Sequence, residues 1–206
     1  MKRALYAVLA VVVVFSAVVV GVKLKQKGGE TDIEVQAQKE VNRQLTALQN
    51  QQPNIFKGTR GKMTKESIAK SIASQARTNE TLKNEAVKRG LTISDDKVEA
   101  AIGQVRAAYA SPKKFDEALK KQNWDLNAYR ENIKNQMLLA ALMNDITKNV
   151  KVNDAEVKAF YDSHKDQYKG KSLKSIFEQV KADALAQKKS QAQQEAVQKL
   201  LEPAKP

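Results

Sequence analysis

The sequence predicts an all-α protein made of an N-terminal transmembrane helix, a helical domain and a long C-terminal helix. Two observations support this prediction. The chain has only eight Gly and four Pro among its 206 residues, which is few for a protein built from strands and tight turns. Apolar residues also recur at intervals of three and four along most of the chain, which is the spacing of one face of an α-helix.

The N-terminal element is expected to be a membrane anchor. Residues 5–22 read LYAVLAVVVVFSAVVVGV and hold no charge. As a helix they would span about 27 Å, close to the roughly 30 Å of a bilayer's hydrocarbon core. A cleaved signal peptide has a similar pattern, but this run is longer than a usual signal core and lacks a good small-x-small cleavage site. We therefore expect a retained signal anchor over residues 1–27. The flanking charges do not determine its orientation, and the short tail before it favours an exported C-terminal part.

A helical stalk and a loop are predicted for residues 28–63. Apolar side chains from Ile33 to Leu48 form a narrow stripe, which needs a partner helix. The pattern is then interrupted by Pro53, Gly58 and Gly61, so a loop is expected over residues 49–63. Thr64 is expected to cap the next helix, which ends at Gly90, a residue that readily adopts the left-handed conformation of helix ends.

The remaining helices are expected to begin at recognisable capping residues. These are Ser94, Ser111 before Pro112, Asp125 before the longest apolar helix at 126–149, Asn153 with Glu156 in a capping box, and Ser172 after a turn at 169–171. Eight of the nine aromatic residues outside the anchor lie between Tyr109 and Phe177, so the compact core is expected there. The predicted domain covers residues 64–201, and residues 202–206 are expected to form a disordered tail.

Composition excludes several kinds of chemistry. The chain has no Cys and one His, so disulfides, thiol nucleophiles and Cys- or His-pair metal sites are excluded. A Ser-His-Asp triad would have to use His164, whose neighbours Asp162 and Ser163 lie at an exposed helix end where adjacent side chains diverge. Asp95 and Asp96 are better explained as first-turn acids that balance a helix dipole than as metal ligands. No catalytic residue, metal or cofactor is expected.

The positive charge is a weak indication of nucleic-acid binding. The formal net charge is +13, but residues 28–206 hold 31 basic and 23 acidic side chains, a net charge of +8. These charges alternate along helical faces, no Lys/Arg block reaches five residues, and no nucleic-acid-binding signature is present. We therefore expect no nucleic-acid partner.

Three segments of the chain, taken in order, resemble a known family. They are TLKNEAVKRGLTISDDKVEAAI (81–102), KFDEALKKQNWDLNAYRENIKNQMLLAAL (114–142) and VKVNDAEVKAFYDSHKDQY (150–168). Their helix caps and apolar spacing resemble the N-terminal chaperone domain of the SurA/PrsA/PpiD group of extracytoplasmic foldases, over about residues 64–201. Where the family often has Gly, this chain has Asn123, which also tolerates the left-handed conformation.

The resemblance implies a chaperone module without the parvulin prolyl-isomerase domain that many members insert after the helix ending here at Tyr168. Only three residues separate Tyr168 from Ser172 in this chain. In the family the last helix packs against the N-terminal helices, which would account for the apolar face from Leu173 to Val180. With the predicted anchor, the resemblance implies a single-pass protein of the bacterial inner membrane with a periplasmic C-terminal domain.

The expected function is therefore that of a holdase, a chaperone that binds unfolded or exported polypeptides and catalyses no reaction. Met-rich and exposed apolar surfaces adapt to varied partners, so client contacts are expected among Tyr109, Trp124, Tyr129, Met137, Met143, Phe160 and Tyr161. Most of these side chains should belong to the core, with Tyr109, Trp124 and Met143 partly exposed. The alternative is a structural adaptor that binds one folded membrane complex through residues 31–50.

Overall fold

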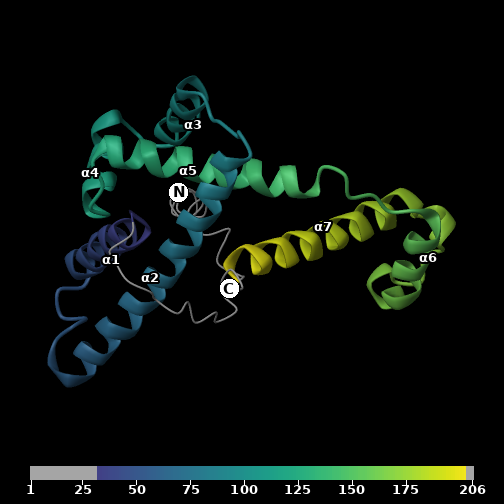
Figure 1. The fold of residues 1–206 in the computed structure, drawn as a ribbon, viewed down its shortest axis with the longest axis horizontal. Helices are drawn as coiled ribbons and strands as arrows, with labels where there is room; N and C mark the ends of the chain where they lie inside the picture. Colours follow the sequence, from purple (N-terminus) through teal and green to yellow (C-terminus); the bar gives the residue numbers. More distant parts are fainter. Residues whose placement is uncertain (1–31, 203–206) are drawn as a thin grey trace. The chain divides into compact units, whose positions relative to one another are not determined.

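The computed structural model describes residues 32–202, and every regular element in this range is a helix (Figure 1). This confirms the all-α prediction for the described range. The predicted transmembrane helix at residues 5–22 and the residues after Glu202 lie outside it. Between residues 32 and 202, no helix combines the length and the apolar character that a bilayer span requires. Within this range the chain forms two compact units, residues 32–142 and residues 143–202.

The first unit begins with a helical hairpin of α1 (Asp32–Gln51) and α2 (Gly58–Lys88). α1 packs along α2, and its stripe residues Ala37 and Val41 are buried. Arg77 of α2 donates hydrogen bonds from Nε and Nη2 to the two carboxylate oxygens of Glu34, at 2.7 and 2.8 Å. The stripe of α1 therefore has the partner helix that it needs, and the boundary predicted between residues 63 and 64 falls inside α2.

The start of α2 differs from the prediction. The loop of the hairpin covers only residues 52–57, and Thr64 lies within the helix, where its Oγ1 donates a 2.9 Å hydrogen bond to the carbonyl of Arg60. Gly61 is buried, and a Cβ at this position would lie 2.3 Å from the carbonyl carbon of Phe56. Gly61, which was expected to interrupt the helix, instead allows the hairpin turn to lie directly against α2.

The predicted end of α2 is confirmed. Gly90 has a φ of 74°, its amide donates to the carbonyl of Val87 at 2.9 Å, and the amide of Leu91 donates to the carbonyl of Ala86 at 3.0 Å. This pair of hydrogen bonds is a Schellman motif, which satisfies carbonyls at the helix end and requires a left-handed residue such as glycine.

Three further helices form the core of the first unit: α3 (Asp95–Ala107), α4 (Pro112–Lys121) and α5 (Leu126–Thr147), whose last residues belong to the second unit. One cluster joins them, with buried Val98, Ile102, Phe115, Leu119, Tyr129 and Ile133. The ring of Phe115 lies edge-on to those of Tyr109 and Tyr129, with centroid distances of 5.4 and 5.8 Å.

The predicted caps of these helices are largely confirmed. The side chain of Ser111 accepts from the amide of Lys114 at 3.3 Å, and that of Asp125 accepts from the amide of Ala128 at 2.8 Å. Ser94 precedes α3 as expected, but its side chain makes no capping hydrogen bond. Asn123 has a φ of 55°, so it does adopt the left-handed turn expected of it.

The second unit contains α6 (Asp154–Ser163), the short 3₁₀ helices η2 (Lys165–Tyr168) and η3 (Leu173–Ser175), and α7 (Phe177–Leu201). The predicted capping box is present, since Asn153 and Glu156 each accept from the other's backbone amide at 2.9 Å. The last α-helix begins at Phe177, later than Ser172, because Ile176 has a φ of −130° and separates η3 from α7.

The core of the second unit accounts for the apolar face of the last helix. Val157, Tyr168 and Val180 are buried there, and Leu173, Ile176 and Phe177 pack against them. The face that was expected to contact the N-terminal helices is thus packed within the second unit. The eight aromatic residues expected in one core divide into two clusters, four in each.

Candidate functional site

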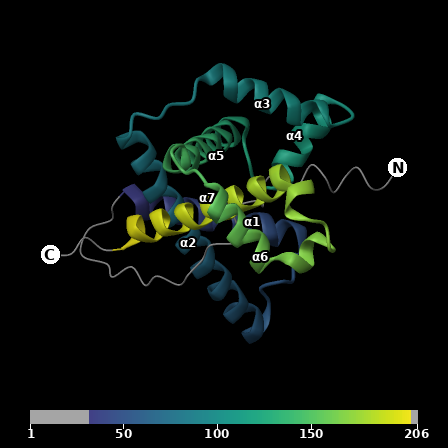
Figure 2. The same ribbon diagram turned by 90° about the vertical axis from the view of Figure 1, so that its right-hand side faces the viewer.

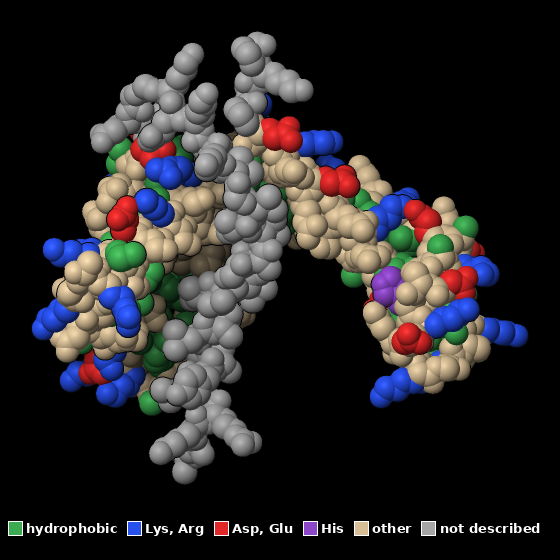
Figure 3. All heavy atoms as spheres, turned by 90° about the horizontal axis from the view of Figure 1, so that it is seen from below, with side chains coloured by type: hydrophobic (Ala, Val, Ile, Leu, Met, Phe, Trp, Pro, Cys, Tyr) green, Lys and Arg blue, Asp and Glu red, His purple; other side chains and the backbone are tan. Residues whose placement is uncertain are grey.

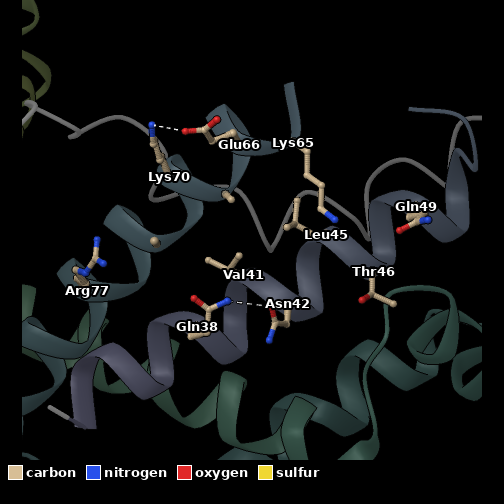
Figure 4. A pocket seen from close by; sticks show the side chains of 12 residues that line it. Gln38, Val41, Asn42, Leu45, Thr46, Gln49, Lys65, Glu66, Lys70 and Arg77 are labelled. Carbon is tan, nitrogen blue, oxygen red and sulfur yellow. Dashed lines mark hydrogen bonds and ion pairs between the residues drawn. The ribbon is translucent and has the colours of Figure 1, made fainter. Parts of the chain in front are cut away.

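Two hollows lie on the first unit. One, of about 630 Å³, runs between α1 and α2. Figure 4 shows its polar rim, with Gln38 and Gln49 on α1 and Lys65 on α2. None of the seven predicted client-contact residues lines this hollow, so the predictions do not point to it.

The other hollow, of about 480 Å³, is bounded by α1, α2 and α5 and includes Trp124. We name it the α5 groove. Its lining is dominated by side-chain amides: Gln36, Gln44, Gln75, Asn79, Asn123, Asn132, Asn135 and Gln136. The rest is charged (Lys39, Glu40, Arg43, Glu80, Lys83 and Glu131) or apolar (Ile72, Ala76, Trp124, Ala128 and Leu139). Three helices converge here beside a predicted contact residue, which makes the α5 groove the candidate site.

Contacts from α1 hold Trp124 at the edge of this groove. The guanidinium carbon of Arg43 lies 3.7 Å from the centroid of the Trp124 ring, a cation–π arrangement. Arg43 Nη1 also donates to the carbonyl of Gln122 at 3.1 Å, and Glu40 accepts from Nε and Nη2 at 2.9 and 2.5 Å. Trp124 is half-buried, as is Tyr109, which confirms that both side chains are partly exposed.

The amides give the α5 groove both donors and acceptors. Three are engaged within the hairpin: Gln44 donates to Glu40 at 2.6 Å, and Gln75 donates to Asn79 at 3.1 Å. The three on α5, Asn132, Asn135 and Gln136, make no side-chain hydrogen bond with any residue between 32 and 202. The groove has three basic and three acidic side chains, so its formal charges cancel.

None of the other predicted contact residues lines the α5 groove. Tyr129 is buried in the cluster of α3, α4 and α5, and Tyr109 and Met137 pack against it. Burial raises the pKa of the Tyr129 hydroxyl, and the nearby Tyr109 adds to this. The Tyr129 hydroxyl is therefore neutral at physiological pH, and its ring is part of the core.

Phe160, Tyr161 and Met143 belong to the second unit. Phe160 stacks on His164 with a centroid distance of 4.2 Å, and the hydroxyl of Tyr161 donates to the carbonyl of Lys171 at 2.6 Å. The expectation that Met143 is partly exposed is wrong, because only 7% of its surface is accessible. Of the seven predicted residues, Trp124 lines the α5 groove, and the other six divide equally between the two units.

The side chains of Ser163 and His164 do meet, contrary to the prediction that they diverge. Ser163 Oγ and His164 Nδ1 lie 2.9 Å apart because both turn back onto α6. Ser163 donates to the carbonyls of Ala159 and Phe160, and His164 Nδ1 lies 2.8 Å from the carbonyl of Phe160. A hydroxyl hydrogen-bonded to backbone carbonyls is not activated as a nucleophile, so this pair caps a helix end.

Asp95, the first residue of α3, contacts α5. Asp95 accepts from Lys134 of α5 at 2.9 Å, and this hydrogen bond lowers the pKa of the carboxyl. Between residues 32 and 202, no group of three or more metal-ligating side chains gathers at one place.

The amides of the groove were not singled out from the sequence, although a signal was present. Asn132, Asn135 and Gln136 share one face of α5, as do Gln75 and Asn79 on α2, because residues three and four apart lie side by side on a helix. A polar stripe of this kind is typical of any solvent-exposed helix face, so only the convergence of three helices identifies it as a site.

These features describe a helical module whose first unit carries a polar groove between three helices. The model of the SurA-like N-terminal domain family matches residues 1–143, and this chain belongs to that family. The match ends where the first compact unit ends, at residues 142 and 143.

Curated relatives are foldases. The chain is 28% identical over 111 residues to the foldase protein PrsA of Clostridium acetobutylicum, covering 52% of this chain and 32% of the relative. It is 29% identical over 104 residues to PrsA of Caldanaerobacter subterraneus, covering 50% of this chain and 28% of the relative, and 29% identical over 99 residues to PrsA of Clostridium perfringens, covering 46% and 28%. The matched region thus spans about a third of the relatives' length. No solved structure matches this chain.

Proposed function

We propose that this chain is a membrane-anchored holdase of the bacterial inner membrane that binds unfolded or exported polypeptides on its periplasmic side, with no isomerase activity. One observation carries the proposal: the match of residues 1–143 to the SurA-like N-terminal domain family. The foldases among its relatives support a role in protein folding, and the apolar run at residues 5–22 supports an anchor.

The α5 groove offers a way to bind many different sequences. An unfolded chain presents backbone N–H and C=O groups whatever its side chains are, and each needs a hydrogen-bond partner once water is displaced. Amides donate and accept at once, so Asn132, Asn135 and Gln136 can pair with backbone groups of either kind. Trp124 and Leu139 provide apolar contact for client side chains, and the balanced charges favour neither acidic nor basic clients.

The absence of isomerase activity is proposed from an internal connection. η2 ends at Tyr168 and η3 begins at Leu173, so the chain passes between them without room for an inserted catalytic domain. The adaptor alternative gains no support from the structure, because the apolar stripe of α1 that would have bound a partner is packed along α2.

The test uses the full chain in lipid nanodiscs and a reduced, unfolding client whose aggregation is followed by light scattering. We expect suppression at equimolar chain, relative to empty nanodiscs. No suppression even at excess chain would reject the holdase function, and catalysis of proline isomerisation in a model peptide would reject the second part of the proposal.

Matched variants test the α5 groove itself. We expect the triple variant Asn132→Ala, Asn135→Ala, Gln136→Ala to lose most of the protection. Alanine has a higher helix propensity than either amide, so α5 should remain folded. The control removes three exposed amides outside the groove: Gln104→Ala, Asn144→Ala and Gln187→Ala. Equal protection by both triple variants would exclude the groove as the client site.

A further inference from the structure

The turn of the α1–α2 hairpin carries an unusual concentration of uncompensated positive charge. Lys57, Arg60, Lys62 and Lys65 are exposed, and no acidic residue occurs between residues 41 and 65. None of the four makes an ion pair with any residue of the described chain. The next acid along the chain, Glu66, is already paired with Lys70 at 2.8 Å. We name residues 55–65 the hairpin tip.

The hairpin tip also exposes apolar side chains. Met63 is 68% exposed, the highest value among the exposed large hydrophobic residues of the described chain. Ile55 and Phe56 of the same segment are partly exposed, and Lys65 Nζ lies 5.8 Å from the centroid of the Phe56 ring. A tip that offers cations and apolar side chains on one short segment has the character of surfaces that lie in a membrane interface.

The hairpin tip projects from the other helices of the first unit. In both ribbon views the turn between α1 and α2 projects away from α3, α4 and α5 (Figures 1 and 2). Figure 3 looks from below, the side toward which the turn points in Figure 1, and Lys and Arg side chains reach outwards along the edge of this unit. Gly61 fixes the turn tightly against α2, since no larger residue fits beside Phe56.

We propose that the hairpin tip binds the surface of an anionic lipid bilayer, with the four cations on lipid phosphates and Met63 in the interface. Each Lys or Arg close to an anionic membrane strengthens binding about fivefold, and the attraction weakens with salt. Phosphates of a nucleic acid would attract the same cations, but they give an exposed methionine nothing to contact, so the apolar component favours lipid. This inference is independent of the proposed holdase function.

The experiment places a fluorophore on the tip. Because the chain has no Cys, Met63→Cys in the full chain can be labelled at that site alone with an environment-sensitive dye. The labelled chain is added to phosphatidylcholine vesicles with or without phosphatidylglycerol. Val87→Cys is the matched control, because Val87 is also a 60% exposed apolar residue on α2, at its opposite end. A dye at residue 63 reports on the tip whether or not residues 5–22 enter the bilayer.

We expect a blue shift and protection from an aqueous quencher at residue 63 only with phosphatidylglycerol, reversed by salt, and no change at residue 87. The triple variant Lys57→Gln, Arg60→Gln, Lys62→Gln should weaken this binding about a hundredfold. Lys113→Gln, Lys120→Gln, Lys121→Gln removes the same charge from α4 and should leave it intact. Equal emission in both kinds of vesicle, or equal loss in the two triple variants, would overturn the proposal.

Discussion

Phe115 is the side chain whose truncation tests the described core most directly. It is 1% exposed, lies between Tyr109 and Tyr129 in edge-to-face contact, and has the Arg106 guanidinium 5.3 Å from its ring centroid. Replacing a buried Phe by Ala costs about 3–5 kcal/mol, and aromatic pairs add about 0.5–1.5 kcal/mol each to simple burial. We therefore expect Phe115→Ala to lower the free energy of unfolding of the first unit by about 4 kcal/mol. For a unit of this size, the melting temperature should fall by on the order of 15 °C.

The chain's single tryptophan makes this loss measurable. Trp124 packs against the same cluster as Phe115, so urea unfolding followed by tryptophan fluorescence reports on it. Phe56→Ala is the matched control, because it removes the same atoms from a half-buried ring at the hairpin tip, where we expect a loss of about 1 kcal/mol. A loss below about 1.5 kcal/mol for Phe115→Ala, or equal losses for both variants, would refute the assigned core.

Three further predictions concern local structure. Asn123→Val should destabilise the chain by about 1–2 kcal/mol while Asn123→Gly has little effect, because φ at this residue is 55°; urea midpoints distinguish the two. Glu34→Gln should cost about 1 kcal/mol at neutral pH. The Arg77 hydrogen bond lowers the pKa of the Glu34 carboxyl in the folded state. The stabilisation is therefore present above the unfolded-state pKa of about 4.3 and is lost as the pH falls through the lower folded-state pKa. The urea unfolding curves of the wild type and the variant should converge in acid. Asn153→Ala should cost about 1 kcal/mol through loss of the N-cap, whereas Asn153→Ser should retain most of it.

The features that could be predicted from the sequence are those that depend on a few adjacent residues. Gly90 ends α2, Asp125 and Asn153 cap their helices, and Asn123 adopts the left-handed turn. In each case one side chain or one backbone angle satisfies the groups at a helix end, so the signal and its structural result lie within a few residues. The order of these signals along the chain was also sufficient to indicate the family that the comparison then identified.

The start of α2 and the exposure of Met143 could not be predicted in this way, because both depend on residues that are distant or in special geometry. Glycine normally weakens a helix, yet Gly61 is required by the approach of the Phe56 backbone, a contact that composition does not reveal. Met143 lies on a helix that is apolar on more than one side, where periodicity cannot tell which side is covered. Its 7% exposure is therefore a result of packing alone.

The α5 groove illustrates the same limit for function. On an isolated helix, the amides of α5 indicate nothing more than a face in contact with water, and the same holds for the amides of α1 and α2. In the folded chain, amides from α1, α2 and α5 line one hollow, and Arg43 packs over Trp124 at its edge. This convergence is what identifies them as a candidate site. Most of the aromatic residues that the sequence suggested as client contacts pack in the hydrophobic cores of the two units. Under the proposed holdase function, recognition of unfolded chains would depend less on exposed aromatic surface than on amides, which match the one feature that all unfolded clients share, the peptide backbone.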